Sequence, residues 1–281
     1  NDGNWVNINE IEILYINRTL NFKNGLLTRK MIIKDNSGNK TELFSKRIAS
    51  MENPHLAAIQ YSIKPLNYSG KITIKTGING NLINDGIDRY KQLNQKHLKS
   101  FAEGGEKNNA FVVVKTTQSD IEIAETYKIN SFLNGNPHNE AEYENIFSDG
   151  EAYTLTSNEI EKNAFYKVEK IVSIFTSREK GIKAPLQEAE MLLEKQTSFD
   201  KILKASEKNW AELWEEIDIK LEGDRLAQKL LRLHLYHLMI TISPHNKNID
   251  AGIPARGLHG EGYRGHIFWG ELFILPFYNI H

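Results

Sequence analysis

The sequence has no cysteine, only 7 prolines in 281 residues, and no apolar run near the roughly 18 to 20 residues that cross a membrane. The lack of cysteine excludes disulfides, thiolate nucleophiles, iron–sulfur clusters and cysteine-ligated zinc. It leaves the compartment open: the cytoplasm or, after removal of a leader, the periplasm or the cell exterior. The chain begins at Asn1 rather than Met and shows no basic-then-apolar leader, so we expect a processed or excised piece of a longer protein.

Neither sign of charge is in clear excess. The chain has 35 basic and 36 acidic residues, a formal net charge of −1, and no long block of like charge. This balance predicts no nucleic-acid partner and no anionic membrane surface as a partner. Hydrophobic residues make up 40% and charged residues 25% of the chain, which is typical of a globular protein of one large or two ordinary domains.

The first two thirds of the chain predict antiparallel strands. The turn-forming segment 35–39 (DNSGN) separates two β-rich runs and favours a hairpin, and residues 71–76 (KITIKT) alternate strictly between polar and apolar. Short β-branched runs separated by polar loops, with no helical periodicity between them, indicate a β-sandwich. The runs are residues 29–34, 41–45, 56–63, 71–76, 110–117, 121–129 and 165–176.

Helical spacing replaces the strand pattern near Pro185. Residues 186–194 and the segment after Ser198, a predicted N-cap, form a helical connector in which Trp210 and Trp214 suit a packing seam. A third helix is predicted over residues 225–242 with Asp224 as its cap. Its apolar stripe is wide, so we expect burial on more than one side; it includes Leu226, Leu230, Leu231, Leu233, Leu235, Tyr236 or His237, Leu238 and Ile240.

The segment from Gly252 to Glu271 combines several glycines with Arg, His, Glu, Tyr and Trp side chains. Glycines let the backbone bend tightly, and such side chains can hydrogen-bond to hydroxyls or stack on the C–H face of a pyranose. This mixture favours a sugar site, with Trp269 or Tyr263 as the stacking plate. The same residues are also compatible with a structural glycine-rich turn, and we weigh the two interpretations equally on spacing alone.

Residues 254–258 (PARGL), 262–269 (GYRGHIFW) and 276–277 (PF) resemble the start of the catalytic barrel of glycoside hydrolase family 65, the maltose, trehalose and kojibiose phosphorylases and related glucosidases. Residues 25–29 (GLLTR), 47–50 (RIAS) and 78–80 (ING) with Asn84 are similar to landmarks of that family's N-terminal domain. The resemblance therefore covers most of the chain.

The resemblance implies a mainly β chain with C-terminal helices. Residues 1–184 would form an antiparallel, galactose-mutarotase-like supersandwich, residues 185–222 a helical linker, and residues 223–281 the first helices of a truncated (α/α)6 barrel. In the family this barrel cleaves an α-glucoside with inversion, using phosphate or water.

The resemblance also places the family's catalytic glutamate and phosphate-binding residues in later barrel motifs, so we expect no catalytic residue and no turnover in this chain. It implies a substrate site for an α-linked glucose disaccharide or oligosaccharide, no organic cofactor and no metal, inorganic phosphate as a co-substrate of the whole enzyme, and a homodimer. The expected substrate-binding residues are Trp269, Arg264, His266, Phe268, Tyr263 and Glu271. The chain departs from the family at Gly270, where an Asp usually follows the Trp, and a carboxylate partner for sugar hydroxyls is lost there.

Three other interpretations remain open. The chain could be a noncatalytic carbohydrate-binding or structural, dimer-forming module. Glu261 and Glu271 could form the acid–base pair of an inverting glycosidase, which needs a separation of about 6.5 to 9.5 Å, although nothing in the sequence gives their distance. His234 and His237 could share a helix face and bind a metal, but no third ligand is evident and structural histidines are the preferred interpretation.

Overall fold

The computed structural model describes residues 5–83, 92–248, 252–253, 266–267, 269–270 and 272–274. Twelve strands in two antiparallel sheets are followed by three α-helices and a short 3-10 helix in this part of the chain. The elements are β1 (Glu12–Asn21), β2 (Leu26–Lys34), β3 (Lys40–Ala49), β4 (Leu56–Pro65), β5 (Gly70–Asn79), β6 (Leu98–Glu106), β7 (Asn109–Thr116), β8 (Glu122–Leu133), β9 (Asn136–Pro137), β10 (Glu144–Ser148), β11 (Glu151–Ile160), β12 (Tyr166–Thr176), α1 (Pro185–Lys195), α2 (Phe199–Ile217), α3 (Arg225–Thr241) and η2 (Pro244–Asn248).

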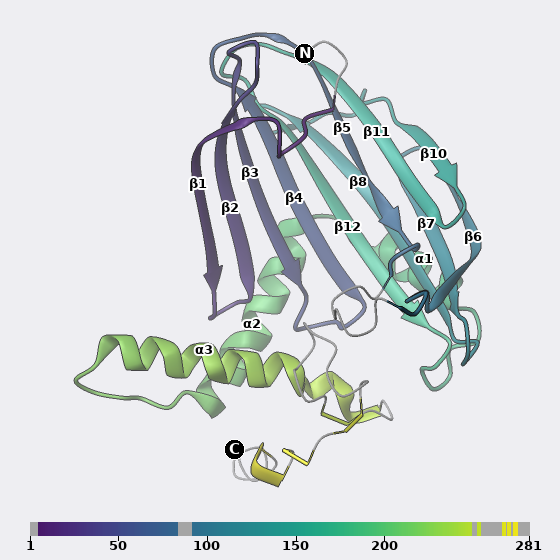
Figure 1. Ribbon diagram of the computed structural model, residues 1–281, viewed down its shortest axis with the longest axis vertical. Helices are drawn as coiled ribbons and strands as arrows, with labels where there is room; N and C mark the ends of the chain where they lie inside the picture. Colours follow the sequence, from purple (N-terminus) through teal and green to yellow (C-terminus); the bar gives the residue numbers. More distant parts are fainter. Residues whose placement is uncertain are drawn as a thin grey trace.

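The large sheet has the strand order β1-β2-β3-β4-β12-β8-β7-β6, with the short β9 paired to β8, and the second sheet has the order β10-β11-β5. Figure 1 shows α1 and α2 behind the large sheet, the smaller sheet in front of its other half, and α3 across the lower ends of β1 to β4. The predicted sandwich followed by helices is confirmed.

The core between the two sheets is formed by alternate residues of their facing strands, among them Val112, Tyr127, Val168 and Ile78. The opposite face of the large sheet is buried by the helices, where Ile48, Ala58 and Ile171 pack against Leu193, Phe199 and Ile202. The large sheet therefore has an inner face toward the second sheet and an outer face toward α1 and α2. Within the described part of the chain, the three-stranded sheet does not extend over β1 to β3 (Figure 1).

Local signals placed the turns and caps correctly. The Asp35 carboxylate accepts hydrogen bonds from the backbone N–H groups of Ser37 and Asn39, both at 2.9 Å, and Gly38 has φ +83° in the hairpin between β2 and β3. Ser198 caps α2, and the carboxylate of Asp224 caps α3 by accepting from Leu226 N at 2.8 Å and Ala227 N at 3.0 Å. These bonds satisfy N–H groups that a helix start otherwise leaves without a partner.

One expectation about α3 was wrong. Leu226 and Leu230 are 65% and 46% exposed, and the buried side chains are Leu235, Tyr236 and Met239 in the second half of the helix. The reason is position, since the first half of α3 projects past the edge of the large sheet (Figure 1). Its described polar contacts are those of Gln228 with Ile219 and Leu221 and of Arg232 with Asp218.

Candidate functional site

The C-terminal segment follows α3 in the chain, so its position depends on the contacts that hold this helix. Arg232 on α3 forms a bidentate pair with Asp218 at the end of α2, with Nε donating to Oδ1 at 2.8 Å and Nη2 to Oδ2 at 2.6 Å. The hydrogen bonds from Arg232 hold the pKa of Asp218 below its ordinary value, and the same contact raises the pKa of Arg232. Two parallel hydrogen bonds fix orientation as well as distance, so this pair sets the angle between α2 and α3.

An aromatic cluster joins α3 to the sandwich. The ring of Trp210 stacks on Tyr236 with centroids 5.1 Å apart, and Trp214 Nε1 donates to the carbonyl of Phe22 at 2.8 Å. Gly25 closes the β1–β2 turn with φ +67°, and a Cβ there would lie 3.0 Å from Trp210 Nε1. The helical spacing of Trp210 and Trp214 predicted this packing seam, and glycine at position 25 leaves room for the indole.

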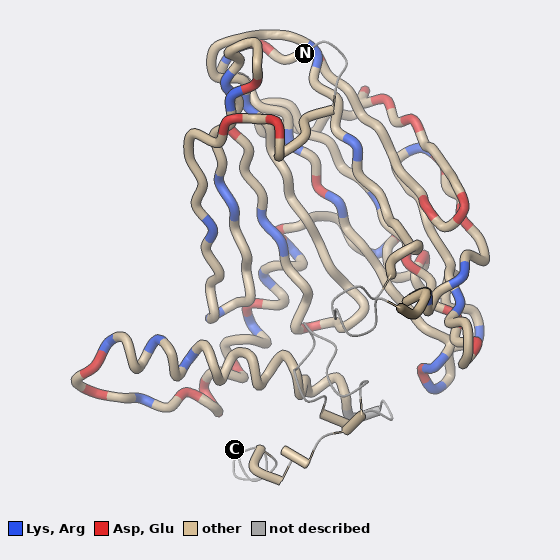
Figure 2. Tube along the Cα trace, viewed as in Figure 1, with Lys and Arg blue, Asp and Glu red and all other residues tan. Residues whose placement is uncertain are grey.

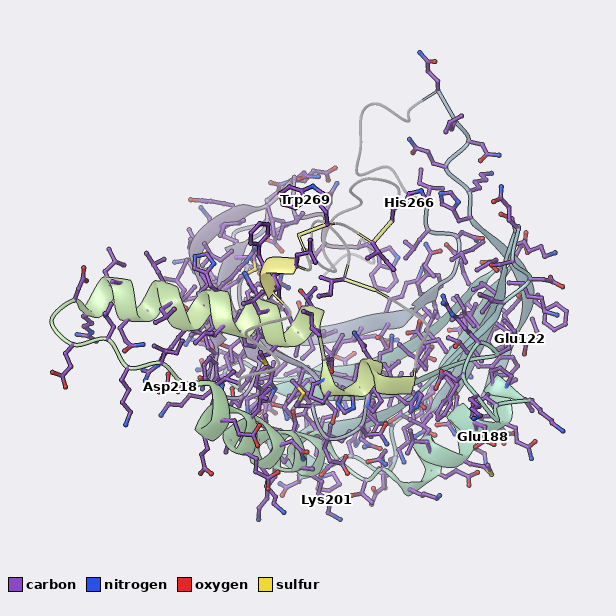
Figure 3. The ribbon with its side chains drawn as sticks, turned by 90° about the horizontal axis from the view of Figure 1, so that it is seen from below. Glu122, Glu188, Lys201, Asp218, His266 and Trp269 are labelled. Carbon is purple, nitrogen blue, oxygen red and sulfur yellow. The ribbon has the colours of Figure 1, made fainter. Side chains whose placement is uncertain are left out.

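Trp269 and His266 are the two predicted substrate-binding residues that the structure describes. Trp269 is 64% exposed and its ring meets Phe273 edge-on with centroids 5.6 Å apart. A single helical turn follows, because the N–H groups of Leu272 and Phe273 bond to the carbonyls of Trp269 and Gly270, both at 3.1 Å. His266 is also exposed. In Figure 3 both side chains lie on the side of α3 away from Lys201, so the indole is not sealed in an apolar interior.

The other four predicted substrate-binding residues, Arg264, Phe268, Tyr263 and Glu271, lie outside the described residues, as does Glu261. The separation of Glu261 and Glu271 therefore stays a sequence-based question. Gly270 is half-buried within the turn after Trp269 and has no side chain that could accept a hydrogen bond.

A cleft of about 700 Å³ lies on the sandwich, between the β6–β7 turn and the α1–α2 connection. Its floor is the end of β8, where Asn130 Nδ2 donates to the carbonyl of Thr197 at 3.3 Å and Tyr143 Oη donates to Ser131 Oγ at 3.0 Å. Amide and hydroxyl side chains make up about half of the lining, which also includes Phe132 and His138. Lys167 Nζ lies over one face of the Phe132 ring, 3.8 Å from its centroid. The sequence analysis did not predict this cleft, because residues 107–108, 129–143 and 197–198 meet only in the folded chain.

Among the described residues, no group of three or more His, Asp or Glu side chains could hold a metal ion. The alternative with His234 and His237 thus lacks a third ligand in this part of the chain, and the ring of His237 lies 5.9 Å from that of Tyr236. No helix in the described ranges is long and apolar enough to cross a membrane.

The chain thus combines a mainly antiparallel sandwich, a helical connector and an exposed indole near its C-terminal end. The family model "Glycosyl hydrolase family 65, N-terminal domain" matches residues 1–213, and "Glycosyl hydrolase family 65 central catalytic domain" matches residues 232–281. The chain belongs to glycosyl hydrolase family 65.

Several curated relatives match nearly the whole chain. An uncharacterized glycosyl hydrolase of Mycobacterium tuberculosis (strain ATCC 25618 / H37Rv) is 33% identical over 98% of this chain and 21% of its own length. The kojibiose phosphorylase of Halothermothrix orenii and the alpha,alpha-trehalose phosphorylase of Thermoanaerobacter brockii are each 31% identical, over 99% of this chain and 36% of their own lengths. The chain thus spans about a third of the phosphorylases it matches.

A solved structure shares the fold. It is assigned to a kojibiose phosphorylase from the human microbiome and superposes with a TM-score of 0.80 over 97% of this chain and 34% of its own. Its sequence identity of 21% supports the architecture alone.

Proposed function

We propose that this chain is the sandwich, helical linker and barrel entrance of an inverting α-glucoside phosphorylase that acts on α-linked glucose disaccharides with inorganic phosphate as nucleophile. The observation that carries the proposal is the match, over 99% of the chain, to relatives named kojibiose and trehalose phosphorylases. Trp269 suits one wall of the glucose pocket because its indole is exposed and C–H faces of a pyranose stack on such rings. Arg264, His266, Phe268, Tyr263 and Glu271 complete the proposed wall.

The proposed domain limits are 1–184 for the sandwich, 185–222 for the linker and 223–281 for the start of the barrel. In an inverting mechanism a carboxylic acid protonates the leaving oxygen while the nucleophile attacks from the opposite face. No residue of this chain matches the family's general-acid motif, so the 281-residue chain alone is expected to release no glucose 1-phosphate from kojibiose, trehalose or maltose plus phosphate. A rate above the buffer control would refute this.

Saccharide binding tests the proposed wall directly. Titration calorimetry with glucose and kojibiose should detect weak binding, and Trp269→Ala should weaken it about tenfold, a free-energy loss of about 1.4 kcal/mol. Trp5 is a matched control, since it is 59% exposed and lies at the other end of the chain. If the wild type and Trp269→Ala bind the saccharides with equal affinity, Trp269 is not part of the binding site.

The cleft on the sandwich favours a second candidate function, noncatalytic carbohydrate binding. Its amide and hydroxyl groups can pair with sugar hydroxyls, and Phe132 can stack on a sugar face. If maltoheptaose binds here, Phe132→Ala and Asn130→Ala should weaken binding while Trp269→Ala leaves it unchanged. The opposite pattern would assign binding to the C-terminal segment.

A further inference from the structure

The loop between β3 and β4 hydrogen-bonds to two elements that precede the C-terminal segment. The backbone N–H of Met51 in this loop donates to Ser206 Oγ on α2 at 3.0 Å, and the carbonyl of Met51 lies 2.9 Å from His245 Nε2 on η2. Because a carbonyl oxygen can only accept, the imidazole of His245 donates this second bond. One residue of the sandwich therefore holds both α2 and η2.

Contacts of the β3–β4 loop with itself and with β12 give it a fixed shape. Ser50 Oγ accepts hydrogen bonds from the backbone N–H groups of Glu52 and Asn53, at 3.2 and 3.1 Å. Further along the loop, the ring of His55 stacks on that of Phe175 on β12, with centroids 3.7 Å apart. The loop is thus attached to the sandwich on both sides of Met51, and it can act as a fixed reference point for α2 and η2.

The surroundings of Met51 are apolar. Its side chain is 9% exposed and belongs to one cluster with Trp210, Tyr236 and Met239, and Ser206 beside it is buried. Figure 2 shows charged residues on the first half of α3 but none on its second half, and residues 233–246 contain no Lys, Arg, Asp or Glu. Hydrogen bonds are stronger in such an environment than in water, and a polar group that loses its partner there is costly.

We propose that His245 is a positioning residue: its hydrogen bond to Met51 fixes the start of the segment that carries Trp269 and keeps this segment in the arrangement that binds the saccharide. The segment continues from η2 in the chain, so a shift of η2 moves its starting point. The inference rests on the proposed function, because Trp269 belongs to the proposed glucose wall. When only one arrangement binds, the apparent dissociation constant rises as the population of that arrangement falls.

Fluorine NMR of the 281-residue chain labelled with 5-fluorotryptophan tests the positioning without any sugar. The chain has four tryptophans, and the variant Trp269→Phe assigns the resonance of Trp269. His245→Leu removes the donor and should shift or broaden this resonance, whereas His245→Gln, whose amide group can donate instead, should restore the wild-type resonance. His234→Leu is the matched control, since it makes the same change at an exposed position of α3, and it should leave the resonance unchanged.

Titration calorimetry with glucose and kojibiose then connects position with binding. His245→Leu should weaken the affinity about fivefold, on the scale of one net hydrogen bond, while His245→Gln and His234→Leu should match the wild type. The two proposals fail in different ways. A wild-type chain that binds neither saccharide would refute the proposed glucose wall, and the fluorine spectra would still decide whether His245 positions Trp269.

The positioning role is overturned if a folded His245→Leu variant keeps the wild-type resonance of Trp269, if His234→Leu shifts that resonance as much, or if His245→Gln behaves like His245→Leu. Circular dichroism shows whether each variant is folded. If His245→Leu does not fold, Ser206→Ala takes its place, because it leaves the N–H of Met51 without its acceptor and disturbs the same loop. An unchanged Trp269 resonance in folded Ser206→Ala would then overturn the proposal.

Discussion

Lys170 is a buried cation between the two sheets. It is 8% exposed, its ammonium group donates to the carbonyl of Gly77 on β5, and it lies 4.6 Å from the centroid of the Tyr127 ring. Burial lowers its pKa to about 8, partly offset by the charge of Glu125, whose own pKa is raised by burial. Lys170 thus connects the two sheets, and burial of its charged form costs stability that is regained when the ammonium group loses its proton.

This pKa shift predicts a stability that rises with pH. The unfolded side chain keeps its proton up to about pH 10.5 and the folded one loses it near pH 8, so the unfolded state binds more protons between these values. The free energy of unfolding of the wild type minus that of Lys170→Met should therefore rise from pH 8 to pH 9.5, by up to about 1.4 kcal/mol per pH unit. Buried tyrosines oppose the trend only at higher pH, because their raised pKa values lie above 10.

Urea unfolding followed by circular dichroism at a series of pH values measures this difference. Lys75→Met is the control, because Lys75 also lies over a tyrosine ring, at 3.9 Å from the centroid of Tyr153, but is exposed. The difference between wild type and Lys75→Met is the reference profile for the loss of an exposed lysine from the same region. A flat profile for Lys170→Met would contradict the buried-cation account.

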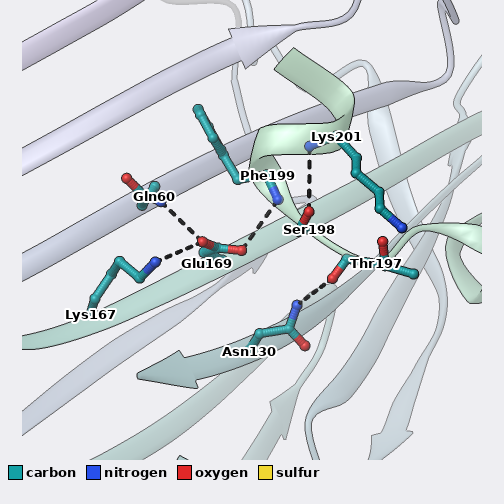
Figure 4. A network of polar contacts seen from close by, with 8 residues as sticks. All are labelled: Gln60, Asn130, Lys167, Glu169, Thr197, Ser198, Phe199 and Lys201. Atoms are coloured by element: carbon teal, nitrogen blue, oxygen red, sulfur yellow. Dashed lines mark hydrogen bonds and ion pairs between the residues drawn. The ribbon is translucent and has the colours of Figure 1, made fainter. Parts of the chain in front are cut away.

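At the scale of elements, one buried carboxylate attaches α2 to the large sheet. Glu169 on β12 is 2% exposed and accepts hydrogen bonds from Lys167 Nζ at 2.9 Å, Gln60 Nε2 at 3.0 Å and the backbone N–H of Phe199 at 3.2 Å (Figure 4). Phe199 is the first residue of α2, where the helix dipole is positive and N–H groups lack intrahelical partners. The carboxylate satisfies this helix end and holds it against the sheet.

Removing the charge of Glu169 should loosen this attachment. Glu169→Gln is expected to cost about 1.5 to 3 kcal/mol of unfolding free energy, since it weakens charged hydrogen bonds in a buried site. Relative to the wild type, Glu169→Gln should speed amide hydrogen exchange more at the first turn of α2 than in α3. Glu215→Gln, an exposed change on the same helix, should stay within about 0.5 kcal/mol of the wild type. A loss of that small size at position 169 would mean that apolar packing alone places the helix.

The elements that periodicity predicted are those that bury apolar side chains at regular positions. Residues 71–76 alternate and lie within β5, and the helical spacing after Pro185 gave α1, α2 and α3 to within a few residues. β11 was missed because its buried positions include Thr154 and Thr156, which bond to the hydroxyls of Tyr127 and Tyr166 at 2.8 and 2.7 Å. A search for alternating apolar residues does not detect buried positions that are occupied by threonine and paired through hydroxyl groups. β1 was missed because it is an edge strand with nearly every residue exposed.

At the scale of the whole molecule, less of the candidate site could be predicted from the sequence. Trp269 and His266 followed from residue types and from resemblance, since stacking and hydrogen-bonding side chains stand close together in the sequence. Other groupings needed strand register, which places Arg18, Arg29 and Tyr61 in one row of the large sheet although up to 43 positions separate them along the chain. A turn signal such as segment 35–39 indicates that two neighbouring strands pair, but it does not give the register across four strands. The cleft beside Asn130 likewise depends on segments that only the fold brings together.

The exposed first half of α3 gives the last prediction. Leu226 and Leu230 are one helical turn apart, and with Ile219 (40% exposed) and Leu221 (46% exposed) in the preceding connection they present apolar side chains to solvent. Such surface favours association, so the 281-residue chain should form oligomers whose fraction rises with concentration in light scattering. The double variant Leu226→Lys, Leu230→Lys should be monomeric at concentrations where the wild type associates. Leu93→Lys is the control, because Leu93 is 66% exposed and belongs to a loop of the sandwich, and this variant should still associate. Monomers of the wild type at every concentration would show that this half of α3 makes no contact between copies.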